Sequence, residues 1–146
     1  MRLGAAGLAA RMLAWRLALP ALKRALPLAA LARLAWPRRG RRLRVPAREA
    51  LVLGIAARLY GTGRRDDNCL ERSVLAYRFL AEAGAEPQLA CGIRRVNGEV
   101  VGHAWIVLDG RPLAAADEAV EGYTLVAAFG VGGAPLAAVF QPSQIL

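Results

Sequence analysis

The dipeptide Asn97-Gly98, which joins two apolar runs in the second half of the chain, most restricts the fold. Asn-Gly favours the left-handed backbone of a two-residue hairpin turn, so it predicts antiparallel strands over about 88–95 and 99–108. With these two residues at the turn, the numbers of opposed residues add up to 195. The turn therefore predicts the register of the hairpin as well as its existence.

This register places His103, the one histidine of the chain, opposite Gly92. We expect the imidazole to lie over the gap that the glycine leaves. Because side chains alternate between the two faces of a strand, His103 shares a face with Trp105, whereas Cys91 points to the other face. Cys91 is thus predicted to be a core residue. The other cysteine, Cys69, is then the only one with a route to His103.

A helix start is predicted at Asn68, just before Cys69. Asn68 is a suitable N-cap, and Glu71 stands three places later, where its side chain would reach back to the cap amide. Cys69 then takes the first helical position, where unpaired backbone N–H groups and the positive end of the helix dipole favour a thiolate. The alternative is that Cys69 is a small buried hydrophobic residue, as most free cysteines are.

The helix that begins at Cys69 is expected to continue to Ala83 and to stop at Gly84. Its apolar residues recur at helical spacing, so one face is predicted to be buried and the other to face solvent. The buried stripe comprises Leu70, Val74, Tyr77 and Ala81, and the outward residues are Arg72, Arg78 and Glu82.

Positive charge is concentrated in the first 65 residues, and the rest of the chain is mildly acidic. Residues 1–65 hold 15 of the 20 Lys and Arg residues and one acidic residue, a net charge of +14, whereas residues 66–146 carry −5. Since the excess positive charge belongs to residues 1–65 and not to the rest of the chain, we expect no nucleic-acid partner. Two cysteines and one histidine supply neither a disulfide framework nor a zinc cluster, so we expect no metal or cofactor and a cytoplasmic location.

We divide the chain into a basic arm, 1–45, and a body that forms the main domain, 46–146. The arm is expected to form two short helices broken by Pro20, Pro27 and Pro37. Its uncharged runs do not exceed eight residues, far short of the roughly 18 needed to cross a bilayer. We therefore expect no membrane crossing, although the Leu and Trp content would permit peripheral contact with an anionic membrane surface.

Further elements follow from the positions of glycine and proline. The segments concerned are a helix from residue 46 to about 60, a strand from 111 to about 116 after the Asp109-Gly110 turn, and one or two closing strands at 123–129 and 136–140. A helix that begins with a cysteine, followed by antiparallel strands that carry a histidine, resembles the α+β core of papain-like and transglutaminase-like proteins.

Three sequence blocks also resemble the transglutaminase-like leader peptidases of lasso peptide biosynthesis. They are Asn68-Cys69-Leu70-Glu71-Arg72-Ser73, then Cys91-Gly92-Ile93-Arg94-Arg95, and then Gly102-His103-Ala104-Trp105-Ile106-Val107-Leu108-Asp109-Gly110-Arg111-Pro112. The resemblance covers about residues 64–113. It implies a stand-alone cysteine protease that removes the leader from a ribosomally made precursor peptide. Its partners would be a small leader-binding protein and an ATP-dependent, asparagine-synthetase-like macrolactam cyclase.

By motif match, Cys69 would be the nucleophile and His103 the general base. The acidic residue that commonly completes the triad in this family aligns with Ala115, which cannot orient an imidazole. Asp117 is two residues further along and on the same strand face, so we favour it as the third member. Asp109 is the alternative, although the Asp-Gly turn already explains it, and a dyad completed by water is a third arrangement.

Two other functions remain open. A non-catalytic adaptor would use the basic arm to bind a partner or a membrane surface. A transglutaminase-like enzyme would form the same thioester on Cys69 and pass the acyl group to an amine instead of water.

Overall fold

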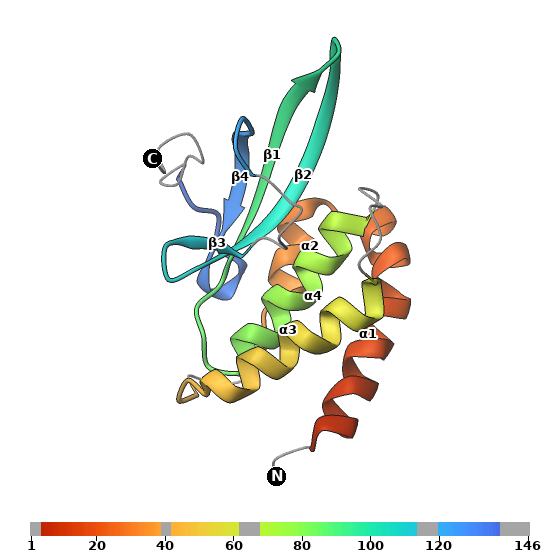
Figure 1. Cartoon of the computed structure of the whole chain (residues 1–146), viewed down its shortest axis with the longest axis vertical. Coiled ribbons are helices and arrows are strands. Elements are labelled where there is room, and N and C mark those ends of the chain that lie inside the picture. Colours follow the sequence, from red (N-terminus) through yellow and green to blue (C-terminus); the bar gives the residue numbers. More distant parts are fainter. Residues whose placement is uncertain (1–3, 39–41, 62–67, 114–119, 138–146) are drawn as a thin grey trace.

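The fold is α+β, with helices packed against an antiparallel sheet (Figure 1). It was obtained as a computed structural model that describes residues 4–38, 42–61, 68–113 and 120–137. The sheet has four strands in the order β3-β2-β1-β4. Helix α4 packs on β2 and β1. The predicted class, a helix that starts with Cys69 on an antiparallel sheet, is confirmed.

The central hairpin has the predicted register. Strands β1 (Gln88–Val96) and β2 (Glu99–Leu108) pair so that Gly92 lies opposite His103. Asn97 and Gly98 both have positive φ, 51° and 81°, which a two-residue turn of this type requires. The tip of this hairpin projects beyond the helices (Figure 1).

The outer strands agree with the prediction where the structure describes them. Strand β3 (Arg111–Leu113) pairs with β2 and β4 (Thr124–Phe129) pairs with β1. The remainder of the predicted 111–116 strand lies outside the described residues. The second closing strand, predicted at 136–140, also extends beyond them. The described chain next to it contains a single bridge, Phe129 to Pro135, after the short 3₁₀ helix η2 (Val131–Gly133).

Helix α4 (Cys69–Glu82) begins and ends within one residue of prediction, but it is buried on nearly every side. Val74 and Tyr77 are fully buried, as expected. The prediction that Arg78 and Glu82 face solvent is wrong. Their side chains are covered by the N-terminal arm, so α4 is a central helix and not an amphipathic surface helix.

The start of α4 is as predicted, but the capping box is not formed. Asn68 takes the N-cap position without a side-chain hydrogen bond to the helix. Glu71 is buried and pairs instead with Lys23 of the arm, at 3.1 Å. The basic side chain offers Glu71 a charged partner, which a buried carboxylate requires.

The arm forms two helices, α1 (Ala5–Ala25) and α2 (Leu28–Ala35). The prediction that Pro20 breaks the first helix is wrong, because α1 continues through it. Leu19, next to the proline, is fully buried against the core, and this packing offsets the lost backbone hydrogen bond.

Helix α1 has the length and apolar composition of a membrane span, with a mean hydropathy of 1.2. This criterion considers length and composition only, so the expectation that the arm does not cross a membrane stays a prediction. A core helix of a soluble protein and a signal sequence meet the same criterion. Here Leu8, Met12 and Leu19 of α1 are buried in the main core.

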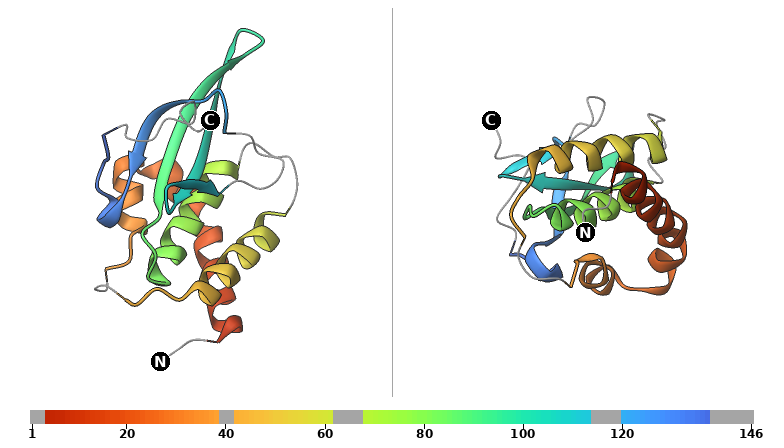
Figure 2. Two further views of the ribbon diagram at one scale, coloured as in Figure 1. Left: turned by 60° about the vertical axis from the view of Figure 1, so that its left-hand side comes forward. Right: turned by 90° about the horizontal axis from the view of Figure 1, so that it is seen from below.

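Helix α3 (Pro46–Tyr60) ends at Gly61 as predicted, and α1, α2 and α3 surround α4 when the molecule is seen from below (Figure 2). One hydrophobic cluster joins side chains of these helices to β1 and β2. The core is thus continuous across residue 45. The division into an arm and a main domain at that position stays a prediction.

Candidate active site

The first turn of α4 lies against strand β2. The Ser73 hydroxyl donates a buried hydrogen bond of 3.1 Å to the carbonyl oxygen of Ala104. Cys69 stands four residues before Ser73 and therefore on the same face of the helix. Ala104 is the neighbour of His103 along the strand. The serine bond thus ties the cysteine-bearing turn to the strand segment that carries the histidine.

Cys91 lies close to this turn as well. Burial, and secondarily the nearby Cys69, raise the pKa of the Cys91 thiol to about 12. Its strand partner is Ala104, on the face of the sheet toward α4. Cys91 is half-buried and remains a neutral thiol near pH 7, so it is a poor nucleophile. Cys69 is also half-buried and reduced, at the first residue of α4.

His103 belongs to a cluster of aromatic rings on the opposite sheet face. Its ring stacks on Trp105, with centroids 5.8 Å apart, and tilts against Tyr123 at 5.2 Å. Tyr123 in turn carries the guanidinium of Arg94 over its ring, at 4.7 Å. These contacts hold the imidazole on the face of the sheet away from α4, whereas Cys69 lies near Cys91 on the α4 side. The structure therefore brings Cys69 to Cys91 and not to His103, and the predicted route between Cys69 and His103 is not seen in this arrangement.

The gap at Gly92 is filled by a different residue than predicted. A Cβ atom there would lie 2.9 Å from the Trp105 ring and 2.9 Å from the Thr124 carbonyl oxygen. The expectation that His103 occupies this gap is therefore wrong. The indole reaches across because diagonal cross-strand neighbours are within reach of a large aromatic side chain.

The structure separates the two candidates for the third catalytic member. Asp117, the favoured one, lies outside the described residues. Asp109 has an exposed carboxylate that accepts two hydrogen bonds of 2.7 Å from Arg44, and this guanidinium lowers the carboxyl pKa. Arg44 also donates to the buried Glu49 at the start of α3. Asp109 thus connects the β2–β3 turn to Arg44, which lies just before α3.

Two side chains around the site, Ser73 and Tyr123, were not assigned a place near the site from the sequence. Ser73 could have been found from its spacing, since it lies one helical turn after Cys69. Trp105 lies on the face of His103 as the strand alternation predicted. Tyr123 gave no comparable signal, because its contact with His103 depends on the pairing of β4 with β1. Among the described residues, no group of three His, Cys, Asp or Glu side chains could hold a metal ion.

A family model described as the transglutaminase-like superfamily matches residues 9–128. The chain belongs to this superfamily. The match begins within α1 and ends within β4, so it includes the arm as well as the helix and strands of the site. The superfamily includes cysteine proteases, and acyltransferases are also common in it. Searches of curated proteins and of solved structures returned no match.

Proposed function

We propose that the protein is a cysteine protease that removes the leader from a lasso peptide precursor. Membership of the transglutaminase-like superfamily supports the proposal, together with the hydrogen bond from Ser73, one turn after Cys69, to the backbone of Ala104, the neighbour of His103 in β2. The sequence blocks around these residues, which resemble lasso leader peptidases, supply the substrate class. The third member of the triad is proposed to be Asp117.

This mechanism requires a rearrangement that brings the His103 ring from its place beside Trp105 to the Cys69 thiol. His103 then takes the proton of the thiol, and the sulfur attacks the carbonyl carbon of the scissile bond. The backbone N–H of Cys69 is the natural donor to the oxyanion, since helix N-terminal amides are unpaired. His103 then gives its proton to the leaving amine. Water hydrolyses the thioester and releases the second product. A leader-binding protein would present the precursor, and an ATP-dependent cyclase would close the released core peptide.

The test is reconstituted processing of a precursor with its leader-binding partner, followed by mass spectrometry. Wild-type protein is expected to release the leader, whereas Cys69→Ala and His103→Ala are expected to release none above background. Cys91→Ala is the matched control and should process normally. Loss of processing in Cys91→Ala, with normal folding, would contradict the assignment.

The acyl-transfer alternative is separated by adding a primary amine to the same reaction. Incorporation of the amine at the new carboxyl end, at the expense of free acid, would favour transfer over hydrolysis. A folded wild-type protein that releases no leader would favour the adaptor function.

A further inference from the structure

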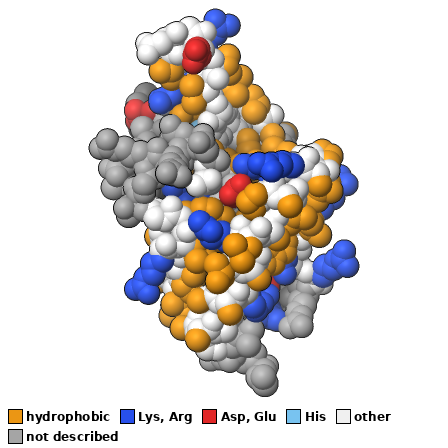
Figure 3. Space-filling model, turned by 90° about the vertical axis from the view of Figure 1, so that its right-hand side faces the viewer, with side chains coloured by type: hydrophobic (Ala, Val, Ile, Leu, Met, Phe, Trp, Pro, Cys, Tyr) orange, Lys and Arg blue, Asp and Glu red, His pale blue; other side chains and the backbone are white. Residues whose placement is uncertain are grey.

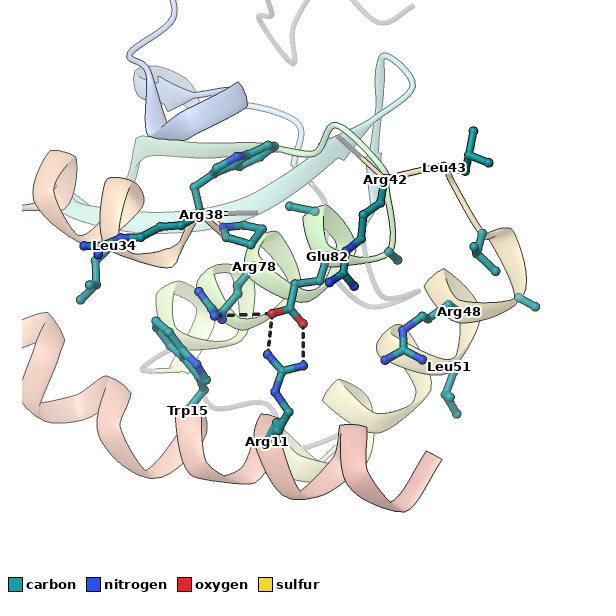
Figure 4. A pocket seen from close by; sticks show the side chains of 16 residues that line it. Arg11, Trp15, Leu34, Arg38, Arg42, Leu43, Arg48, Leu51, Arg78 and Glu82 are labelled. Atoms are coloured by element: carbon teal, nitrogen blue, oxygen red, sulfur yellow. Dashed lines mark hydrogen bonds and ion pairs between the residues drawn. The ribbon is translucent and has the colours of Figure 1, made fainter. Parts of the chain in front are cut away.

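A basic cleft lies between the arm and the C-terminal half of α4 (Figure 4). It has a volume of about 1100 Å³. The charged residues along it are Arg11, Arg38, Arg42, Arg48, Arg78 and Glu82, a net charge of +4. This volume lies just above the roughly 300–1000 Å³ of pockets that hold drug-sized ligands, so the cleft has room for a short peptide segment.

The floor of the cleft is built from partly buried ion pairs. Glu82 accepts hydrogen bonds from Arg11, at 3.0 and 2.5 Å, and lies 3.5 Å from Arg78 (Figure 4). The guanidinium of Arg78 stacks over Trp15 at 4.4 Å. One carboxylate is shared by two arginines, so the floor keeps an excess of positive charge.

The rim of the cleft carries two further positive charges that form no ion pair with another described residue. Arg38 and Arg42 are exposed, and no hydrogen bond or ion pair joins either of them to another described residue. Exposed apolar side chains lie beside them, among them Leu34, Leu43 and Val45. The rim therefore alternates positive charge with apolar surface.

We propose that the basic cleft binds an acidic peptide segment that also carries apolar side chains. Carboxylates would pair with the rim arginines, and apolar side chains would contact the Trp and Leu surfaces between them. The concave shape favours a peptide over a membrane, because a flat bilayer surface cannot reach the floor between α1 and α4. Glu82 on that floor disfavours a phosphate backbone.

The cleft is separate from the Cys69 site. Arg78 follows Cys69 by nine residues in α4, which is about 14 Å along the helix axis. An extended peptide covers that distance in roughly four to five residues. The identification of the bound segment as part of the precursor or of its leader-binding partner rests on the proposed function. On that basis, the segment lies at least about four residues from the scissile bond.

The test is fluorescence anisotropy with a short fluorescein-labelled peptide of alternating glutamate pairs and leucines. It uses the full chain with the Cys69→Ala substitution, so binding is measured without catalysis. The double variant Arg38→Glu/Arg42→Glu should raise Kd roughly tenfold or more, and added salt should weaken wild-type binding. A peptide with lysine in place of glutamate should not bind.

The matched control is Arg24→Glu/Arg58→Glu, which makes the same change in net charge on exposed residues outside the cleft. Its Kd should stay within about twofold of wild type. An equal loss in both double variants, or no binding of the acidic peptide, would overturn the proposal. So would preferential binding to anionic phospholipid vesicles or to single-stranded RNA that depends on Arg38 and Arg42.

Precursor processing distinguishes this proposal from the proposed function. If both stand, the cleft variant raises KM and leaves kcat unchanged. Peptide binding without any processing would contradict the protease function but not the proposal that the cleft binds an acidic peptide. Processing without peptide binding would contradict the proposal that the cleft binds an acidic peptide but not the protease function.

Discussion

The two cysteines differ because of where the fold puts them. Cys69 starts a helix and stands on the same face as Ser73, whereas Cys91 lies within a central strand where burial raises its thiol pKa to about 12. The sequence predicts this contrast, because the helix-start signal precedes Cys69 and the alternation of side chains along the strand points Cys91 to the face away from His103. It could not show that Cys91 lies close enough to Cys69 for an electrostatic effect, because that depends on how α4 crosses the sheet.

Cys91 makes a testable contribution to alkaline stability. Its folded pKa, about 12, exceeds the ordinary value of 9.0, so between these pH values the unfolded chain binds fewer protons than the folded one. The free energy of unfolding should be unaffected by this group below about pH 9 and should fall as the pH rises toward 12. Cys91→Ala should lose about 1 kcal/mol at pH 7 but decline less at high pH. Chemical denaturation between pH 7 and 11 measures this, and a decline equal to wild type would contradict it.

Asp117 and Asp109 should respond differently to loss of charge. Asp117→Asn is expected to lower kcat/KM for processing, by a smaller factor than His103→Ala, because an orienting group assists a base that is still present. Asp109→Asn should lower the melting temperature, since its carboxylate accepts the hydrogen bonds of Arg44. Kinetics and thermal melts of both variants check this. The reverse ranking in kcat/KM would assign the orienting role to Asp109.

At the scale of elements, the β1–β2 hairpin followed most directly from sequence, because Asn97-Gly98 determines both turn and register. The residues that surround α4 were the hardest to predict from the sequence. Its polar residues Arg78 and Glu82 resemble a solvent face in a single-helix pattern, yet the arm supplies Arg11 and Trp15 as their partners. A pairing between residues so far apart in the chain leaves no local periodicity to detect.

Gly92 gives a prediction about the packing of the sheet. A methyl group there would meet the Trp105 ring and the Thr124 carbonyl oxygen at 2.9 Å, so Gly92→Ala should cost roughly 1–3 kcal/mol of unfolding free energy. Gly102→Ala is the control, because the nearest atom to its added Cβ is 4.0 Å away. Denaturation midpoints and the near-ultraviolet circular dichroism of the tryptophans test this. Equal effects of the two substitutions would mean that the indole does not fill the gap.

At the scale of the whole molecule, the basic arm is part of the folded core. Hydrophobic and positively charged side chains lie interspersed on the face that appears at the right of Figure 1 (Figure 3). Several basic residues of the arm neutralise buried acids of the body, as Lys23 does for Glu71 and Arg11 for Glu82. The net charge of the arm therefore serves the fold as well as any partner. Arg44 likewise pairs with acidic residues of the same chain, Glu49 and Asp109.

Glu82 is predicted to hold the arm to the body. Glu82→Gln should lower the free energy of unfolding by roughly 1–3 kcal/mol, because it leaves the half-buried Arg78 without its carboxylate partner. Glu99→Gln, at an exposed position at the start of β2, is the control and should change stability by less than about 0.5 kcal/mol. Urea denaturation of both variants measures the difference. Equal stability would mean that Arg11 and Arg78 do not depend on the shared carboxylate.

The central claim is that Cys69, and not Cys91, carries the acyl group during leader removal. Rapid acid quenching of a processing reaction, followed by intact-mass and peptide mapping, tests it most directly. We predict a hydroxylamine-sensitive thioester on the peptide that contains Cys69, present in wild type and Cys91→Ala and absent in Cys69→Ala. An adduct on Cys91, or processing that continues in Cys69→Ala, would contradict the account.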